Sequence, residues 1–451
     1  MTEIVILAAG EGKRMNSALA KVLQPVGGQA MIRHLIRSVR ALGPEAIRVV
    51  VGSGAEQVEA ELADDGCEFV VQSERLGTGH AAVQALPLMD PGARVLILPG
   101  DMPLIRTETL DQLLACPADL AVLSFVPEDP TGYGRILRDG QGRVTAIREQ
   151  RDASAAERAV AEVNSGVMCA RVGDWVSWLG RVRADNTQGE YYLTDCIALA
   201  VADSRSVEAV VADDPDELLG ANDRRQLAEL EQVYQRRARN ALMDAGVTLP
   251  DPGSVQVRGR VRCERDVLID RGAILEGEVR LGEGVVVGPG CVVRDSTLAA
   301  GTRLEPYCVL ESVRTTGACT IGPFARLRPG TELAAGVKIG NFVEVKNARF
   351  HSGAKASHLS YVGDAEVGER ANLGAGTITC NYDGANKHRT DIGADAFIGS
   401  NTALVAPVSV GQGATIGAGS VIGRDAPADQ LTLTRSTQRS IRGWQRPVKK
   451  G

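Results

Sequence analysis

In the second half of the chain, an aliphatic residue recurs at every sixth position. The clearest run extends over residues 392–422, where a glycine follows most of the aliphatic residues. Because six is a multiple of two, extended chain places these residues on one side, and a fixed longer period means that the chain turns back on itself once per period. The same spacing returns in three earlier runs. The aliphatic positions of the four runs are Ile269, Leu275, Leu281, Val287, Val293, Leu298, Leu304, Leu310, Ile321, Leu327, Leu333, Ile339, Val345, Ile392, Ile398, Leu404, Val410, Ile416 and Ile422.

This period predicts a β-helix built from short parallel strands and tight corners. Three six-residue sides close a triangular coil of about 18 residues, and successive coils stack at a spacing of about 4.8 Å. A composition with 51 glycines and only 4% aromatic residues suits such a core. Small aliphatic side chains fill its axis, and glycine, asparagine or aspartate occupies the corners. The period does not determine the handedness of the coil.

The period is broken twice between Val345 and Ile392, at residues 351–361 and 380–390. Insertions in a repeat structure emerge as loops, commonly on its binding face. The first break contains His358, and a histidine, with a reference pKa of about 6.5, is suited to take a proton from an amine. Among the other histidines, His34, His80 and His388 are weaker candidates, whereas the sequence does not set His351 aside.

The first half of the chain alternates between strand-like and helical segments. Such alternation predicts an α/β, Rossmann-like domain with a mostly parallel sheet, helices on both faces and ligands at the carboxyl ends of the strands. The expected strands are residues 4–7, 48–51, 69–71, 95–98 and 120–126, and the expected helices are residues 31–42, 56–62, 80–88 and 107–115.

Residues suited to binding a phosphate or a metal ion follow two of the expected strands in this half. A glycine-containing loop follows the first strand, and Arg14 and Lys21 beyond it are suited to neutralise a phosphate. The loop matches neither GxGxxG nor GxxxxGK[ST], and an ordinary strand-to-helix turn looks much the same. Asp101 ends another apolar strand, where a carboxylate can hold Mg²⁺ beside substrate phosphates or can cap the next helix.

Helical spacing of apolar residues over 227–242 predicts one long amphipathic helix between the two halves. We therefore expect an α/β, Rossmann-like domain at 1–221, a helical linker at 222–252 and a β-helix domain with a basic tail at 253–451.

Charge and composition narrow the function classes. A net charge of −6 gives no electrostatic footprint for nucleic acid. No apolar run is long enough to span a membrane, and the N-terminus does not resemble a signal peptide. The nine cysteines are scattered without a CxxC pair, which favours reduced, mostly buried thiols. These features predict a cytoplasmic protein.

Six segments of the first half, in order, carry a family resemblance: LAAGEGKRM, QSERLGTGHA, LPGDMPL, DPTGYGRI, EVNSGV and QGEYYLTD. They resemble the nucleotidyltransferase half of the bacterial bifunctional N-acetylglucosamine-1-phosphate uridylyltransferase/glucosamine-1-phosphate N-acetyltransferase family. By this resemblance the uridine nucleotide is bound by Leu7, Ala8, Ala9, Gly10, Gln72, Gly77, Thr78 and Gly100, its phosphates by Arg14 and Lys21, the sugar by Gly134, Glu149 and Asn164, and Mg²⁺ by Asp101 and Asn222.

The second half is similar to the acetyltransferase half of the same family through FARLRPG, NFVEVK, SHLSYVGD and NLGAGTITCNYDG. The resemblance implies a left-handed parallel β-helix of hexapeptide repeats. It also implies that His358 is the general base, that the Ala375 amide binds the oxyanion, that Arg328, Lys346, Tyr361, Asn372 and Lys387 bind the sugar phosphate, and that Asn381, Tyr382, Ser400, Ala418 and Arg435 join Ala375 in binding acetyl-CoA.

The activity that the resemblance implies has two steps. Glucosamine 1-phosphate is acetylated from acetyl-CoA, and the product then takes UMP from UTP with release of pyrophosphate. The family also implies Mg²⁺, a homotrimer with acetylation sites between subunits, and a role in supplying precursors for peptidoglycan and lipopolysaccharide. Two residues depart from the family pattern, because Lys13 stands where threonine is common and Pro99 where a ring or hydroxyl side chain is common.

Two other interpretations stay open from the sequence. The chain can be a sugar-1-phosphate nucleotidyltransferase, such as an ADP-glucose or dTDP-glucose pyrophosphorylase, whose β-helix only builds the oligomer. Alternatively, the second half can be a non-catalytic assembly module. The residues that distinguish these are Arg328, Lys346, His358, Asn381 and Tyr382, which a purely structural prism has no reason to carry.

Overall fold

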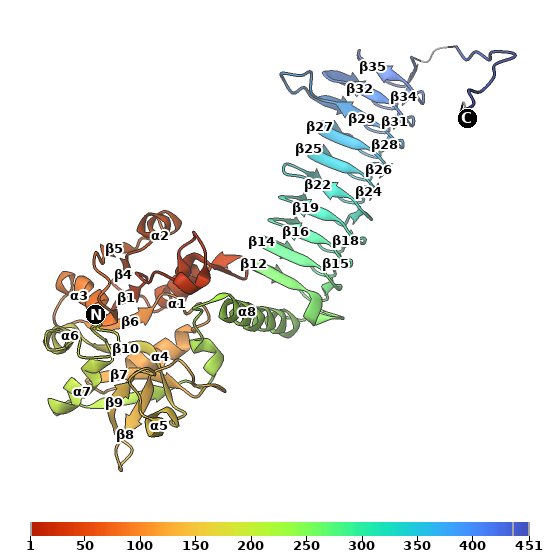
Figure 1. The fold of residues 1–451 in the computed structure, drawn as a ribbon. Helices are drawn as coiled ribbons and strands as arrows, with labels where there is room; N and C mark the ends of the chain where they lie inside the picture. Colours follow the sequence, from red (N-terminus) through yellow and green to blue (C-terminus); the bar gives the residue numbers. More distant parts are fainter. Residues whose placement is uncertain (1, 435–436, 450–451) are drawn as a thin grey trace. The chain divides into compact units, whose positions relative to one another are not determined.

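The computed structural model describes residues 2–434 and 437–449. The chain divides into two compact units, Met1–Gln235 and Arg236–Gly451, and the division falls inside helix α8, Arg224–Asp244 (Figure 1). α8 confirms the long helix expected between the halves. Its residues Leu230 and Val233 belong to a core cluster of the first unit, whereas Leu242 belongs to the core of the second. Within the described ranges, no helix is long and apolar enough to cross a membrane.

The first unit contains the mostly parallel sheet that the sequence predicts. Its strand order is β11-β7-β10-β6-β1-β4-β5, and β10 alone on this path runs antiparallel to its neighbours. All five expected strands are present, and a hairpin, β8 with β9, extends the sheet beside β10. The strands are β1 Thr2–Leu7, β4 Ala46–Val51, β5 Glu68–Val71, β6 Arg94–Pro99, β7 Leu120–Phe125, β8 Arg135–Arg138, β9 Val144–Arg148, β10 Val163–Arg171 and β11 Val207–Val211, with a separate β2 Pro25–Val26 and β3 Gln29–Ala30.

Helices cover both faces of this sheet. Strand alternation explains why, since Ile4 and Ile6 of β1 enter one core cluster and Val5 enters another on the opposite face. The four expected helices are present, and three further ones follow. The helices are α1 Met31–Arg40, α2 Ala55–Glu61, α3 Thr78–Ala85, α4 Thr107–Ala115, α5 Ala155–Arg158, α6 Val172–Leu179 and α7 Asp195–Ala202, with 3₁₀ turns Lys13–Met15, Lys21–Leu23, Leu86–Leu88 and Pro215–Leu218.

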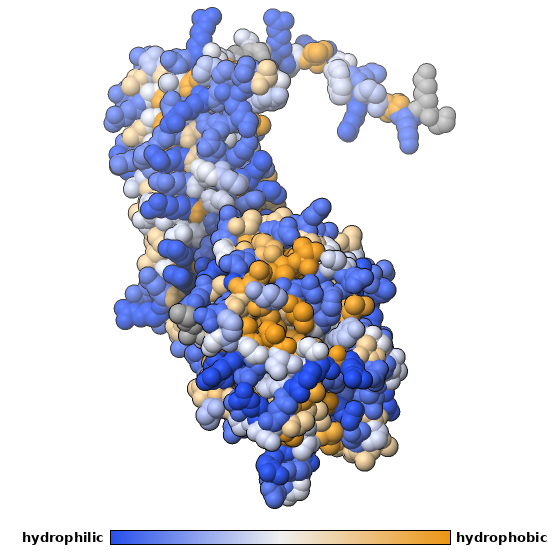
Figure 2. All heavy atoms as spheres, turned by 90° about the vertical axis from the view of Figure 1, so that its left-hand side faces the viewer, coloured by the Kyte–Doolittle hydropathy of each residue, from blue (hydrophilic) through white to orange (hydrophobic). Residues whose placement is uncertain are grey.

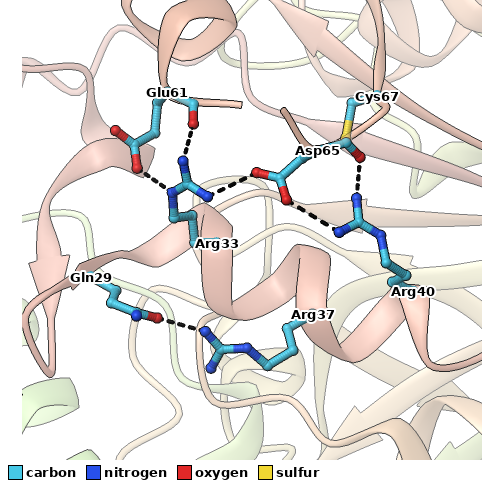
Figure 3. A network of polar contacts seen from close by, with 7 residues as sticks. All are labelled: Gln29, Arg33, Arg37, Arg40, Glu61, Asp65 and Cys67. Atoms are coloured by element: carbon cyan, nitrogen blue, oxygen red, sulfur yellow. Dashed lines mark hydrogen bonds and ion pairs between the residues drawn. The ribbon is translucent and has the colours of Figure 1, made fainter. Parts of the chain in front are cut away.

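Helix α1 illustrates how a polar face is used in this unit. Figure 3 shows Arg33 and Arg40, one side of α1, directed at the turn that carries Asp65. Arg33 also pairs with Glu61, and this carboxylate raises the pKa of the guanidinium. Exposed ion pairs of this kind contribute about 0–1 kcal/mol each to the stability of the fold. The apolar face of α1, which is buried against the sheet, therefore contributes more to holding this helix in place than the ion pairs do.

The second unit is the predicted parallel β-helix. Strands of most successive coils pair in register at separations of 17 or 18 residues, as in Val286 with Arg303 and Thr320 with Lys338. The separation is 25 residues across the inserted loop, as in Asn372 with Phe397. Every aliphatic residue of the four sequence runs is at most 3% exposed. The strands are β12 Gln256–Cys263, β13 Leu268–Ile269, β14 Ile274–Leu281, β15 Val286–Val287, β16 Val292–Arg294, β17 Thr297–Leu298, β18 Arg303–Leu304, β19 Val309–Glu311, β20 Arg314–Thr315, β21 Thr320–Ile321, β22 Arg326–Leu327, β23 Glu332–Leu333, β24 Lys338–Asn341, β25 Glu344–Phe350, β26 Lys355–His358, β27 Tyr361–Val367, β28 Asn372–Leu373, β29 Ile378–Cys380, β30 Thr390–Ile392, β31 Phe397–Ile398, β32 Ala403–Val405, β33 Val408–Val410, β34 Thr415–Ile416, β35 Val421–Ile422 and β36 Leu431–Thr432.

The first expected break in this repeat is not a loop, and that prediction was wrong. The coil continues through residues 351–361 because Phe350 and Ala356 take the inward positions, each fully buried, after steps of five and six residues. Because a phenylalanine and an alanine occupy these two inward positions in place of Ile, Leu or Val, the aliphatic period is not visible in the sequence here. The second break is a true insertion, since residues 381–389 leave the coil between β29 and β30 and protrude beside β29 (Figure 1).

The surfaces of the two units differ in character. Figure 2 shows apolar side chains gathered on one face of the first unit, whereas the visible face of the β-helix is mostly hydrophilic. This agrees with the inward orientation of the β-helix aliphatic residues. All nine cysteines are free thiols, six of them buried, as expected from their spacing.

Candidate active sites

A cavity of about 790 Å³ opens at the carboxyl ends of β1 and β6 in the first unit. This is the sheet edge where a nucleotide is expected in an α/β fold. The predicted residues that line it are Leu7, Ala8, Ala9, Gly10, Lys21, Gln72, Gly77, Thr78, Asp101, Glu149 and Asn164. Four predicted residues do not line it, namely Arg14, which is exposed, and Gly100, Gly134 and Asn222, each of which is next to a lining residue.

One wall of this cavity requires glycine. Gly77 has a φ of 110°, and a Cβ there would lie 2.6 Å from the carbonyl oxygen of Tyr191. The Gln72 side chain, which is buried, donates to the Gly77 carbonyl oxygen at 3.2 Å. Thr78 begins α3 and accepts a hydrogen bond from the backbone N–H of Leu193 at 3.1 Å. Gln72, Gly77 and Thr78 are therefore held at one edge of the cavity by contacts with one another and with residues 191–193.

Lys21 joins the two residues expected to hold a metal. Its Nζ lies 2.5 Å from Oδ2 of Asp101 and 3.2 Å from Oδ1 of Asn222. Asp101 is buried directly after β6, and Asn222 lies just before α8. The fold thus brings a carboxylate and an amide oxygen to one cation, although the two residues lie far apart in the sequence. Oxygen donors of this kind suit Mg²⁺.

The sugar-site candidates form a second group in the same cavity. Glu149 accepts a hydrogen bond from the Thr194 hydroxyl at 3.0 Å, and burial raises the pKa of this carboxyl. The side-chain amide oxygen of Asn164 accepts from the backbone N–H of Gly166 at 2.9 Å, and the backbone N–H of Asn164 donates to the Gly134 carbonyl oxygen at 2.8 Å. Gly134 is close enough to Glu149 that a Cβ would touch the carboxylate at 3.4 Å. Thr194 was not anticipated from sequence.

The two departures from the family pattern have local explanations. Lys13 lines the nucleotide pocket, and its Nζ lies 3.0 Å from the carboxylate of Glu11. Glu11 also pairs with Arg75 at 2.9 Å, so two cations share one carboxylate at the pocket, with one positive charge in excess. Pro99 ends β6, and its ring lies against Gly166, where a Cβ would meet it at 2.9 Å. Neither Glu11 nor Arg75 was singled out from sequence.

In the second unit, His358 and three predicted acetyl-CoA residues stand in one column. Asn341 of β24 pairs in register with His358 of β26, and the following coils place Ala375, Ser400 and Ala418 at the equivalent position. Backbone bonds follow the column, including Asn401 N–H to Ala375 at 2.7 Å and Gly419 N–H to Ser400 at 2.8 Å. The column runs along one corner of the prism.

His358 differs from the other histidines in its surroundings. Its exposed ring contacts Asn341 through Nδ1, 2.7 Å from Oδ1, and within the described chain no partner is recorded for Nε2. His351 pairs with Glu366, His388 lies 2.7 Å from Asp383, and buried His34 lies 2.8 Å from the Val26 carbonyl oxygen. His80 contacts Gln72. His358 is thus the exposed histidine whose recorded side-chain partner is a neutral amide, whereas His351 and His388 pair with carboxylates.

Three cations meet on the wall next to this corner. Arg328 and Lys346 lie on adjacent coils, and the inserted loop contributes Lys387. The Lys387 ammonium, with a smaller effect from Arg328, holds the pKa of Lys346 below its ordinary value. Arg328 donates to Glu344 at 2.9 Å, a residue that sequence reasoning missed. The three cations outnumber the one carboxylate, Glu344, and such an excess of positive charge suits the binding of a phosphate.

The remaining predicted residues are spread over two walls. Tyr361 lies over Gly363, and Asn381 donates to Asp364, which also accepts from Asn347. The Tyr382 hydroxyl donates to the Gly384 carbonyl oxygen at 2.6 Å within the inserted loop. Asn372, however, lies in the ten-stranded sheet and not on the wall of Arg328 and Lys346. Arg435 falls outside the described residues.

Together these features define a protein with two transferase halves, one built on a nucleotide-binding α/β sheet and one on hexapeptide coils. Residues 4–179 match the family model of the MobA-like NTP transferase domain, and residues 389–424 match that of the bacterial transferase hexapeptide (six repeats).

Full-length relatives share both halves. The chain is 56% identical over 453 residues to the bifunctional protein GlmU of Stutzerimonas stutzeri, covering 99% of each. It is 56% identical over 445 residues to that of Alkalilimnicola ehrlichii, covering 98% of this chain and 96% of the relative. It is 54% identical over 449 residues to that of an Azoarcus species, covering 99% of each. The chain belongs to the bifunctional GlmU family, which confirms the expected enzyme class of uridylyltransferase joined to acetyltransferase.

Proposed function

We propose that the chain acetylates glucosamine 1-phosphate at the His358 corner and transfers UMP to the resulting N-acetylglucosamine 1-phosphate in the cavity of the first unit. The observation that carries this proposal is the occurrence of two chemically different sites in separate units. One combines a carboxylate, an amide oxygen and a lysine, and the other combines a histidine with a free ring nitrogen and three clustered cations. The first suits phosphoryl chemistry, and the second suits acyl transfer to the amine of a phosphorylated sugar.

In uridylyl transfer, a phosphate oxygen of the sugar 1-phosphate attacks the α-phosphorus of UTP. The new P–O bond forms as the bond to the β-phosphate breaks, and pyrophosphate leaves. Alignment and charge neutralisation are what this reaction requires of the protein, with no protein nucleophile. Lys21 supplies positive charge beside Asp101, the edge at Gln72 and Gly77 receives the nucleotide, and Glu149 and Asn164 orient the sugar.

Asp101 and Asn222 would hold Mg²⁺ in this site. Their oxygens already converge on one cation, the ammonium of Lys21, so the donor set fits the ion. Among the described residues no group of three or more His, Cys, Asp or Glu side chains is suited to a metal, which agrees with an ion held by few protein ligands and by substrate phosphates. The bound ion would supply neutralisation of the phosphate charge.

In acetyl transfer, the glucosamine nitrogen attacks the thioester carbonyl carbon of acetyl-CoA. Nε2 of His358 takes the proton that the amine loses, and the C–S bond breaks as the amide forms. The His358 imidazolium then gives this proton to the CoA thiolate, which restores the neutral base. The amide N–H of Ala375, for which no acceptor is recorded in the described part of the chain, faces the developing oxyanion in this scheme. Arg328, Lys346 and Lys387 hold the sugar phosphate.

We also infer a homotrimer in which copies meet at the His358 corner. Next to the His358 column runs an exposed ladder, defined as Tyr307, Phe324, Phe342 and Leu359, whose members are 48–61% exposed. The aromatic rings stack at 5.2 and 5.3 Å. Exposed apolar residues in a row favour a protein partner.

The nine free thiols support a reducing compartment, and we infer that the protein acts in the cytoplasm, where UTP and acetyl-CoA are made.

One incubation tests the proposal as a whole. The protein is mixed with glucosamine 1-phosphate, acetyl-CoA, UTP and Mg²⁺, and UDP-N-acetylglucosamine is measured by chromatography. Product is expected only when all four are present, and N-acetylglucosamine 1-phosphate is expected to replace the need for acetyl-CoA. Formation of a UDP-sugar from N-acetylglucosamine 1-phosphate with no acetylation of glucosamine 1-phosphate would instead favour a nucleotidyltransferase with a structural β-helix.

A further inference from the structure

We propose that Asn341 is a positioning residue for His358, fixing the imidazole tautomer that leaves Nε2 free to accept the amine proton. This inference rests on the proposed function of His358 as the base. Nothing in the family motifs quoted above gives Asn341 a role in acetyl transfer. The geometry around the histidine carries the argument.

The contact is direct and specific. Oδ1 of Asn341 lies 2.7 Å from Nδ1 of His358. An amide oxygen can only accept a hydrogen bond, so Nδ1 carries the hydrogen and donates it. In the neutral ring the other nitrogen, Nε2, then has its lone pair free, which is the state a general base requires. A ring without this partner would divide its population between two tautomers, one of which cannot accept a proton at Nε2.

The backbone keeps the two residues opposite each other. Asn341 and His358 are register partners on β24 and β26, and the Leu359 N–H donates to the Asn341 carbonyl oxygen at 3.0 Å. Gly340 allows this closeness, since a Cβ there would lie 1.8 Å from the carbonyl oxygen of Ser357. The register at this rung is therefore fixed by close backbone packing and not by the side-chain contact alone.

The main chain of His358 is held from its other side as well. The buried Ser360 hydroxyl donates to the His358 carbonyl oxygen at 2.8 Å. Leu359, directly after the histidine, has a φ of 48° and turns the corner in the left-handed region. With the backbone fixed, rotation of the ring is the remaining freedom, and Asn341 is the residue that restricts it.

A neutral partner suits this reaction. An aspartate at position 341 would stabilise the imidazolium and raise the pKa of His358, so that more of the enzyme would be protonated and inactive near neutral pH. The other titratable side chains on β24 and β26 are Lys338 and Lys355, and those on β27, which follows the histidine, are Tyr361, Asp364 and Glu366. None of these gives Nδ1 a recorded hydrogen bond among the described residues, so the amide of Asn341 sets the ring orientation.

The test uses the full-length protein and three substitutions, Asn341→Ala, Asn341→Asp and the control Lys338→Ala. Lys338 is an exposed residue of the same strand. We expect Asn341→Ala to lower kcat for acetyl transfer about tenfold to a hundredfold with little change in either KM, a smaller loss than removal of the base itself. We expect Asn341→Asp to move the acidic limb of the kcat/KM profile upward by about one pH unit. Lys338→Ala and the uridylyl transfer of every variant should match the wild type.

A double substitution separates positioning from a general structural effect. If Asn341 acts through His358, then His358→Ala with Asn341→Ala is no slower in acetyl transfer than His358→Ala alone. Additive losses, or an Asn341→Asp profile that coincides with the wild type, would overturn the inference. Full acetyl transfer by His358→Ala would overturn the proposed base itself, whereas a loss there with wild-type rates in Asn341→Ala would remove only the role of Asn341.

Discussion

Lys21 and Asp101 form an ion pair in the nucleotide cavity, with Nζ 2.5 Å from Oδ2 and side chains only 17% and 13% exposed. Asn222 approaches the same Nζ from just before α8. The pair places fixed positive charge beside the carboxylate where the triphosphate and its metal are expected to meet. Shielding from water strengthens such interactions. We therefore expect the uridylyl transfer proposed for this cavity to depend on charge and alignment and not on a protein nucleophile.

Replacing Asp101 with Asn should remove the negative charge that holds this arrangement. We expect uridylyl transfer to fall about a hundredfold or more, because several kcal/mol of charge stabilisation depend on the ion the carboxylate would hold. Pyrophosphate release measures the effect. Acetylation of glucosamine 1-phosphate by the same preparation is the control and should be unchanged. Loss of both activities in a folded protein would contradict the separation of the sites.

Replacing His358 with Ala should have the opposite outcome. Acetyl transfer, followed by release of free CoA thiol, is expected to fall about 10²–10⁴-fold, the range for loss of a general base. UDP-sugar formation from N-acetylglucosamine 1-phosphate should be preserved. His351→Gln is the matched histidine control, since His351 is engaged with Glu366 and should not matter for the rate. An equal loss in both variants would exclude His358 as the specific base.

Lys387→Met tests the cation cluster. With Lys387 gone, the pKa of Lys346 is expected to rise toward its ordinary value, but the phosphate loses one partner. We expect KM for glucosamine 1-phosphate to increase about tenfold, because one charge-assisted contact contributes about 1.5 kcal/mol to binding. We also expect this KM to become less sensitive to salt. Initial rates at several ionic strengths measure this. A change confined to KM for acetyl-CoA would assign Lys387 to the other substrate.

Phe324→Glu tests the exposed ladder as a surface between copies. A carboxylate between the stacked rings of Tyr307 and Phe342 carries a desolvation cost wherever a partner covers it. We expect light scattering after size exclusion to show monomers, with acetyl transfer reduced and uridylyl transfer kept. Val71→Glu, at an exposed apolar residue of the first unit, is the control. An unaltered trimer, or a wild type that is itself an active monomer, would refute the interface.

His34→Gln tests a pH dependence of stability. Burial lowers the pKa of His34 below 6.5, against the opposing effect of the Val26 carbonyl. A lowered histidine pKa stabilises the folded state above the unfolded pKa, and this stability is lost as pH falls through the folded pKa. The melting temperature (Tm) of the wild type should therefore fall more steeply below about pH 6.5 than the Tm of the variant. Parallel curves from pH 7.5 to 5 would contradict the assignment.

The sequence was sufficient for features that depend on neighbours along the chain. The six-residue period predicted which residues of the β-helix point inward, because a period-two strand and a regular corner return each aliphatic residue to the axis. All of these residues are buried. In the same way, the strands and helices of residues 4–115 followed from local spacing, and the family motifs indicated both halves of the enzyme.

The sequence was insufficient where an element depends on how side chains of different size pack together or on pairing with a distant strand. Phe350 and Ala356 fill the axis without an aliphatic period, so a continuous coil was mistaken for a loop. Beyond residue 126, β10 and β11 pair with β6 and β7, strands that lie far along the chain. Packing against a distant neighbour, and not local preference, decides such elements.

The sequence by itself determined the inward residues of the coils, the alternating sheet of the first unit and the family, because these depend on periods and motifs that lie within short stretches. Only the tertiary structure decided that Lys21 joins Asp101 to Asn222 and that Asn341 faces His358. The physical reason is that both contacts depend on the path of the backbone between their partners. The carboxyl ends of strands converge in one sheet, and one complete turn of the β-helix brings the next residue of a column into register.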